Sequence, residues 1–259
     1  MQYLEHDGVK LAYETAGEGE PAMLFVHGWT CDHTFFAPQF EHFSARRRVV
    51  AVDLRGHGES DAPAGPYTMP GFAGDLAWLC GELGIDSLVV VGHSMGGAVS
   101  MALASAYPAL VRAAVLVDAP VLLTPEALKV RVELGASLAA PDGPALARRY
   151  AYDMFLPTDD AVRREQLVER MMRTPQHVVS GCMVGIGSFE MLSAVQHISQ
   201  PVLYIGADKP RGDATLLQPH IPHIVIEQTP GVGHFNQLEA SDKVTGLIES
   251  FLTDTLLIS

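Results

Sequence analysis

The chain has 259 residues, of which 48% are hydrophobic and 18% charged, so it is long enough to bury a large core and is neither disordered nor fibrous in composition. Its formal net charge of −13 disfavours nucleic acid and membrane surfaces as partners, because both are negatively charged and repel an acidic protein. The three cysteines lack metal-ligand spacing, and the sequence shows neither a signal peptide nor a membrane-spanning apolar run, which together predict a reduced, cytoplasmic protein.

The first 120 residues alternate between strand-like and helix-like segments. A hairpin is predicted first, with strands at 2–6 and 9–15 joined by a turn at Asp7-Gly8. Short, continuous apolar runs then predict strands buried on both faces, as in a parallel sheet. These strands are expected at 22–26, 49–52, 88–91 and 111–117, and the helices between and after them at about 34–43, 71–84 and 95–107. Strands that alternate with helices predict an α/β fold with a mostly parallel sheet.

Residues 120–197 have a different pattern. They contain no strong strand signal, and their helix-like pieces are interrupted by prolines at 125, 141, 144, 157 and 175. Strand-like sequence resumes at 201–206 and 223–227, and an amphipathic helix is predicted at about 237–252. We therefore expect a core domain made of residues 1–119 and 198–259, with residues 120–197 inserted as a helical cap.

A serine stands between the third apolar run and an alanine-rich helix pattern. The segment is Gly92-His93-Ser94-Met95-Gly96, a Gly-x-Ser-x-Gly motif in a strand–turn–helix context. The glycines allow close packing around a strained residue, and the turn places the serine Oγ at the edge of the sheet where open α/β proteins bind ligands. Ser94 is the predicted nucleophile.

Several motifs occur together and in a fixed order. His27-Gly28-Trp29 follows the first apolar run, and Asp53-Leu54-Arg55-Gly56-His57-Gly58-Glu59-Ser60-Asp61 follows the second. The serine motif comes next, and Pro230-Gly231-Val232-Gly233-His234-Phe235 follows the last strand. With these motifs the chain resembles the α/β-hydrolase superfamily from about residue 8 to 252. The resemblance implies the α/β-hydrolase fold, a sheet flanked by helices with a helical cap, and no metal or organic cofactor.

The serine needs a base, and the base needs a carboxylate that fixes its tautomer. His234 lies in a glycine-rich loop after the last strand, which makes it the predicted base. The resemblance places the acid three residues after Gly206, but that position is Lys209. Some members of the superfamily carry the acid one strand earlier, where this chain has Asp118. Asp118 is therefore the preferred acid, with Asp208 and then Asp213 as the alternatives.

The remaining site predictions concern the oxyanion hole and the pocket. Acyl transfer needs N–H donors already in place for the oxyanion, and the resemblance assigns them to the backbone of Trp29 and Met95. The 120–197 segment is rich in methionine, an adaptable side chain that suits pockets for apolar groups. The predicted pocket residues are Trp29, Met154, Phe155, Met183 and Phe189.

These features predict a serine hydrolase that cleaves an ester or lactone of a small, largely apolar molecule through an acyl-enzyme. The rival activities on this fold are carbon–carbon bond hydrolysis, perhydrolase or haloperoxidase chemistry and cofactor-free oxygenation, and a ligand receptor is the alternative of another class. A carbon–carbon hydrolase would need a cation for the substrate carboxylate, and Arg55 has no clear placement for that role. The sequence leaves the oligomeric state open.

Overall fold

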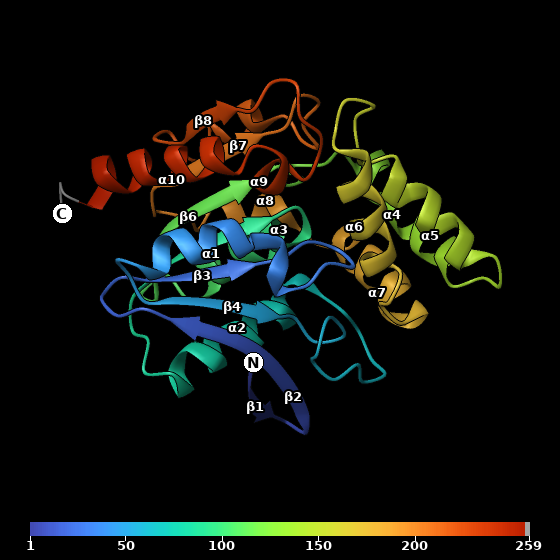
Figure 1. The fold of residues 1–259 in the computed structure, drawn as a ribbon, viewed down its shortest axis with the longest axis horizontal. Helices are drawn as coiled ribbons and strands as arrows, with labels where there is room; N and C mark the ends of the chain where they lie inside the picture. The colour runs from blue at the N-terminus through green and yellow to red at the C-terminus, as the bar shows by residue number, and fades with distance from the viewer. Residues whose placement is uncertain (257–259) are drawn as a thin grey trace.

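The computed structural model describes residues 1–256, which form one sheet flanked by helices (Figure 1). The sheet has eight strands in the order β1-β2-β4-β3-β5-β6-β7-β8. In the hairpin, β1 (Gln2–His6) pairs antiparallel to β2 (Val9–Ala16), and β2 pairs antiparallel to its other neighbour, β4. The other strands are parallel to one another, as predicted: β3 (Ala22–Val26), β4 (Val49–Asp53), β5 (Leu88–His93), β6 (Val111–Val117), β7 (Val202–Gly206) and β8 (Val225–Gln228).

Helices cover both faces of the sheet because alternate strand residues are apolar on each side. On one face α1 (Ala37–Ser44) and α10 (Ser241–Leu256) pack against the strands, and Figure 1 shows them together in front of the sheet. On the other face lie α2 (Met69–Glu82) and α3 (Met95–Ala106). These two helix layers hold the strands in place, and the predicted site residues follow the carboxyl ends of the strands.

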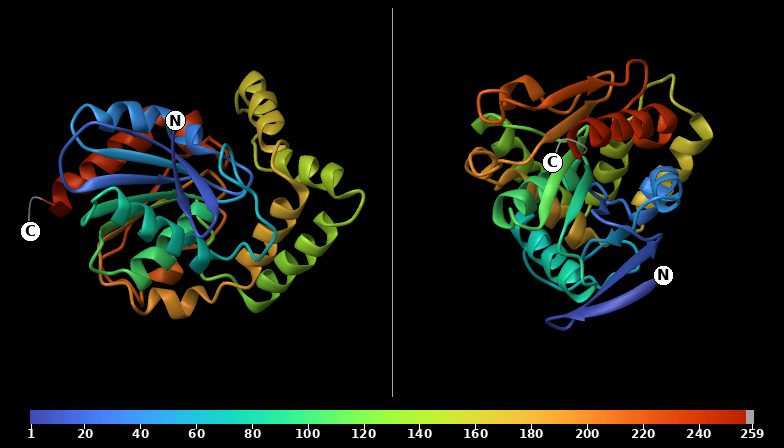
Figure 2. Two further views of the ribbon diagram at one scale, coloured as in Figure 1. Left: turned by 90° about the horizontal axis from the view of Figure 1, so that it is seen from below. Right: turned by 90° about the vertical axis from the view of Figure 1, so that its left-hand side faces the viewer.

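Five helices lie between β6 and β7, the interval in which the sequence shows no strand signal. They are α4 (Pro125–Leu138), α5 (Gly143–Tyr152), α6 (Ala161–Met171), α7 (Gln176–Gly187) and α8 (Met191–Val195). Figures 1 and 2 show α4 to α7 gathered at one end of the sheet, and we call these four the cap helices. The short α8 instead packs on α3. Within residues 1–256, no helix combines the length and apolarity needed to cross a bilayer.

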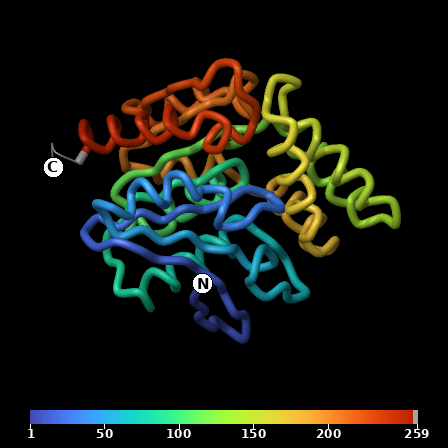
Figure 3. The backbone as a smooth tube through the Cα atoms, in the orientation of Figure 1, coloured from blue at the N-terminus to red at the C-terminus, as the bar shows by residue number. Residues whose placement is uncertain are grey.

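Two predicted helices differ in detail from the structure. The segment predicted as one helix at 34–43 begins with a 3-10 turn, η1 (His33–Phe36), before α1. The last predicted helix is divided into α9 (Asn236–Glu239) and α10, because Ala240 leaves helical geometry with φ −127° and ψ 46°. A further 3-10 turn, η2 (Ala214–Leu217), precedes β8. In the backbone trace of Figure 3 the colour by residue number lets the chain be followed from the N-terminal hairpin through the sheet to α10.

Candidate active site

Ser94 stands on a sharp turn between β5 and α3. Its backbone has φ 52° and ψ −120°, a conformation that L residues rarely adopt and that the surrounding packing must maintain. The flanking glycines explain how this packing is possible. A Cβ at Gly92 would lie 2.2 Å from the carbonyl oxygen of Gly96, and one at Gly96 would lie 2.1 Å from that of Val26. Any side chain at either position would push the turn apart.

His234 and Asp118 form a buried pair. The Nδ1 of His234 lies 2.5 Å from Oδ2 of Asp118, and both side chains are almost fully excluded from solvent. The other carboxylate oxygen of Asp118 accepts hydrogen bonds from the backbone N–H groups of Ala207 (3.1 Å) and Arg211 (3.2 Å). Because the carboxylate accepts, Nδ1 of His234 carries the proton, and Nε2 remains as the acceptor.

The alternative acids lie elsewhere. Asp208 accepts a hydrogen bond from the backbone N–H of Gly231 at 2.9 Å, so it braces the loop before His234. Asp213 caps η2 through the N–H of Thr215 at 3.0 Å, and Lys209, the residue at the usual acid position, is exposed. Of the three aspartates weighed from the sequence, the structure brings only Asp118 to His234.

The loop that carries His234 is fixed from both the core and the cap. Nε2 of His93 donates to the His234 carbonyl oxygen at 2.9 Å, and the His234 N–H donates to the Met154 carbonyl at 3.1 Å. The Asp159 carboxylate, which is buried, accepts from the N–H of Gly233 at 3.0 Å. The position of the imidazole therefore depends on residues that follow α5 in the cap.

The environment of His234 keeps its imidazole neutral. Burial lowers the pKa of His234 below its usual value of 6.5, the bond to Asp118 opposes this shift, and the positive charge of Arg211 adds to it. A histidine with a lowered pKa is unprotonated at neutral pH, which is the form that accepts a proton from a hydroxyl.

The predicted oxyanion loop lies beside the serine. A Cβ at Gly28 would be 3.2 Å from the Cβ of Ser94. Nε2 of His27 accepts from the Leu54 N–H at 3.0 Å, and its Nδ1 donates to the Gly28 carbonyl at 2.8 Å, so His27 ties this loop to the end of β4. In the part of the chain that the structure describes, the backbone N–H groups of Trp29 and Met95 donate no hydrogen bond.

A small cavity brings the serine, the histidine and the cap helices together. Its volume is about 30 Å³, and its lining includes Trp29, Met154 and Met183, three of the residues expected around a substrate pocket. Within residues 1–256 no hydrogen bond joins Ser94 Oγ to His234, a contact that is often loose before substrate binds. Two predicted pocket residues do not line the cavity: Phe155 packs on Phe235 with ring centroids 4.7 Å apart, and Phe189 lies in the hydrophobic core.

The cavity also has lining residues that the sequence did not reveal, and two of them are charged. The five additional lining residues are Pro120, Arg131, Tyr150, Ile186 and Arg211, of which the two arginines are charged. The expected apolar lining is therefore only part of the surface. Arg131 belongs to α4 and Arg211 to the loop after β7, and no local motif indicates that these segments meet. Arg55, the one cation considered from the sequence, instead forms an ion pair with Asp75.

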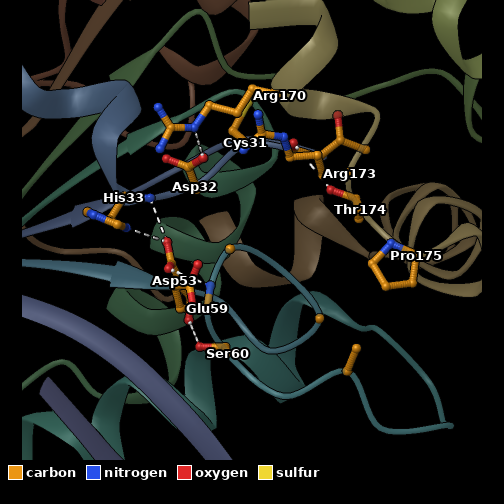
Figure 4. Close-up of a pocket in the computed structure, with 14 residues that line it drawn as sticks. Cys31, Asp32, His33, Asp53, Glu59, Ser60, Arg170, Arg173, Thr174 and Pro175 are labelled. Atoms are coloured by element: carbon orange, nitrogen blue, oxygen red, sulfur yellow. Dashed lines mark hydrogen bonds and ion pairs between the residues drawn. The ribbon is translucent and has the colours of Figure 1, made fainter. Parts of the chain in front are cut away.

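A larger pocket of about 230 Å³ lies elsewhere and does not include Ser94 (Figure 4). On one side of it, Asp32, His33 and Asp53 offer possible metal-ligand atoms within 4.8 Å of one another. However, Asp53 already accepts from the His33 backbone at 2.7 Å and from the Glu59 N–H at 2.9 Å, and Asp32 pairs with Arg170 of α6. We therefore interpret the cluster as a structural brace between the loops and the cap.

The sheet, the strained serine turn and the buried His–Asp pair define a hydrolase of the α/β class. Residues 21–241 match the family model described as alpha/beta hydrolase fold, and the chain belongs to this family.

Individual relatives span nearly the whole chain. A 2-(acetamidomethylene)succinate hydrolase from Mesorhizobium japonicum is 30% identical, covering 92% of this chain and 89% of the relative. A thermophilic esterase from Thermogutta terrifontis, solved with malate bound, superposes with a TM-score of 0.88 at 26% identity, covering 98% of this chain and 99% of the esterase. The enol-lactonase from Burkholderia xenovorans LB400 gives a TM-score of 0.87 at 25% identity, with coverages of 97% and 100%.

Proposed function

We propose that the protein is a serine hydrolase that cleaves an ester or lactone of a small molecule through an acyl-enzyme intermediate. The observation that carries the proposal is the convergence of Ser94 and His234 on one cavity, with Asp118 bonded to the far side of the imidazole. This is the arrangement in which a base activates a hydroxyl nucleophile. The core of residues 1–119 and 198–259 would supply these groups, and the cap of residues 120–197 would cover them.

In the proposed mechanism, Oγ of Ser94 attacks the substrate carbonyl carbon while Nε2 of His234 takes the hydroxyl proton. Asp118 stabilises the imidazolium that forms. The N–H groups of Trp29 and Met95, which donate no hydrogen bond within residues 1–256, donate to the oxyanion. The tetrahedral intermediate collapses, the imidazolium protonates the leaving alcohol, and an ester between Ser94 and the acyl group remains. Water activated by His234 then attacks this ester and releases the acid.

The relatives support hydrolysis and widen the range of substrates. They include an enzyme named for an esterase activity, one named for an enol-lactone and one named for a substituted succinate. A carbon–carbon hydrolase is the second candidate, because such an enzyme needs a cation for the substrate carboxylate and Arg131 and Arg211 line the cavity. Both candidates use the same serine, base and oxyanion donors.

The proposal is tested by turnover of 4-nitrophenyl esters and by labelling with a serine-directed fluorophosphonate. We expect the wild type to react with both, and Ser94→Ala to lose the label and at least about 1,000-fold in kcat. Ser137→Ala, which changes an exposed serine on α4, is the matched control and keeps both activities. Absence of labelling together with absence of turnover of any ester would refute the proposed function, and esterase activity surviving Ser94→Ala would point to another nucleophile.

A further inference from the structure

Two arginines enter the active-site cavity from different parts of the fold. Arg131 comes from cap helix α4 and Arg211 from the core loop after β7, and both line the same cavity as Ser94 and His234. The two charges are close enough to affect each other, because the positive charge of Arg211 contributes to a lowered pKa of Arg131. Burial of Arg131 is the larger cause of that shift.

In the part of the chain that the structure describes, neither guanidinium has a carboxylate partner. Among residues 1–256, the ion pairs of arginine within 4.0 Å involve other positions: Arg46, Arg55, Arg148, Arg163, Arg164 and Arg170. Arg131 donates only to the Ala127 carbonyl of its own helix, and Arg211 only to the Asp153 carbonyl, each at 3.4 Å. These bonds are long and leave most guanidinium donors free.

Two unpaired cations in one partly buried cavity destabilise each other and lose hydration. In a protein with a net charge of −13 anionic side chains are plentiful, yet within residues 1–256 no carboxylate forms an ion pair with either guanidinium. A carboxylate from outside the protein would relieve the repulsion, and the planar guanidinium forms paired hydrogen bonds with such a group. Tyr150, whose ring meets Trp29 edge-on at 5.5 Å, adds a hydroxyl to the same cavity.

We propose that Arg131 and Arg211, with Tyr150, form a carboxylate-binding subsite, and that the substrate is a short acyl compound carrying a free carboxylate. The inference rests on the proposed function, since it names the substrate class of that site. The carboxylate sits on the arginines, and the reacting carbonyl reaches Ser94 in the same small space. A cavity of about 30 Å³ is far smaller than a succinate ester, so lining side chains must shift to admit the substrate.

The subsite is tested with two esters that differ in one group. Mono-(4-nitrophenyl) succinate carries a carboxylate at the end of a four-carbon acyl chain, and 4-nitrophenyl butyrate is the neutral counterpart. We expect the wild type to prefer the succinate ester in kcat/KM. Arg131→Met and Arg211→Met should each lower the succinate-to-butyrate ratio by roughly 10- to 100-fold, the range for losing a hydrogen-bonded charge. A loss of folded enzyme would lower the activity on both esters equally and would therefore leave the ratio unchanged. Arg211→Met also retains the backbone N–H that donates to Asp118, so the acid of the site keeps this hydrogen bond.

The matched control is Arg112→Met, which removes an exposed arginine at the far end of β6 and should leave the ratio unchanged. A wild type without preference for the succinate ester, or arginine variants with an unchanged ratio, would overturn the subsite.

Binding is measured separately from catalysis with Ser94→Ala protein and two non-hydrolysable probes. Succinate should raise the thermal unfolding temperature of this variant, whereas its neutral analogue succinamide should not. In the double variant Ser94→Ala/Arg131→Met, succinate should no longer raise the unfolding temperature. Equal effects of the two probes would contradict the subsite. If no ester is hydrolysed and no fluorophosphonate binds the wild type, the proposed function fails by itself, whereas the succinate result still decides the subsite.

Discussion

At the scale of single residues, Asp118 combines an unusual backbone with a specific set of contacts. Its φ of 42° lies in the left-handed region, which is costly for an aspartate at the end of a strand. In return, one carboxylate oxygen faces His234 and the other accepts from the N–H groups of Ala207 and Arg211. Those two donors come from the loop after β7, which also contains Lys209, the usual position of the acid. The orientation of the Asp118 carboxylate therefore depends on this loop.

Substitution of Asp118 tests its assignment as the acid. Asp118→Asn keeps the shape but removes the charge and favours the wrong tautomer of His234, so we expect kcat to fall by about 10²- to 10⁴-fold. Asp208→Asn and Asp213→Asn serve as controls and should change kcat by less than about 10-fold, because neither contacts His234. Ester hydrolysis by the three purified variants provides the measurement. A larger loss in either control would move the acid to the later loop.

At the scale of elements, the cap is joined to the loop of His234 by backbone hydrogen bonds rather than by apolar contact alone. Asp159, between α5 and α6, accepts from the N–H of Leu156 at 2.7 Å and from that of Gly233 at 3.0 Å. The His234 N–H donates to the Met154 carbonyl in the same region. A displacement of this part of the cap would therefore also displace the base.

Asp159→Asn tests this coupling. Asparagine offers one oxygen where the carboxylate offers two, so one of the two N–H groups loses its acceptor and faces an NH₂ group instead. We expect kcat to fall about 10-fold with a smaller change in KM. Asp160→Asn, which changes the exposed N-cap of α6, is the control: asparagine caps a helix about as well as aspartate, so this variant should keep both kcat and the unfolding temperature close to wild type. Equal kcat values for the two variants would show that the cap contact does not position His234.

The sheet and its strand ends could be predicted from the sequence, because each is specified locally. An apolar run defines a buried strand, and a glycine-flanked serine after it defines the turn at Ser94. The cavity wall could not be predicted, because it depends on how α4 crosses the sheet edge and where the loop of Arg211 returns. Phe155 was predicted to line the cavity but packs on Phe235, since aromatic content in a helical segment does not specify the direction of each side chain.

At the scale of the whole molecule, the loops that form the site contain buried histidines. His27, His93 and His234 each have a pKa below 6.5, chiefly because of burial, and that of His57 is lowered to about 3. His33 is the exception: burial lowers its pKa, but the hydrogen bond to Asp53 together with the negative charges of Asp53, Asp32 and Glu14 outweighs burial, and the pKa is raised. Because all four histidines are buried in the neutral form, the folded structure at this end of the sheet is destabilised when the pH falls and the unfolded chain takes up protons.

This pattern predicts that stability falls as the pH drops below 6.5. A histidine with a lowered folded-state pKa contributes stability that is complete above 6.5 and is lost as the pH falls toward its folded pKa, because the unfolded chain binds the proton first. His33 acts in the opposite sense, as its contribution is complete below 6.5 and is lost as the pH rises through its folded pKa. Below pH 6.5 His33 is protonated in both the folded and the unfolded state, so the slope comes from the four histidines with lowered pKa values and is at most about 5 kcal/mol per pH unit.

Urea unfolding at pH 7.5, 6.5 and 5.5 measures this slope. The midpoint should fall with pH, and His57→Gln should reduce the dependence because one buried titrating group is removed from the set. His223→Gln, at an exposed position before β8, should leave the dependence as in the wild type. A midpoint that stays constant over this range would mean that proton uptake on unfolding is balanced, and that the buried histidines of the site do not govern acid stability.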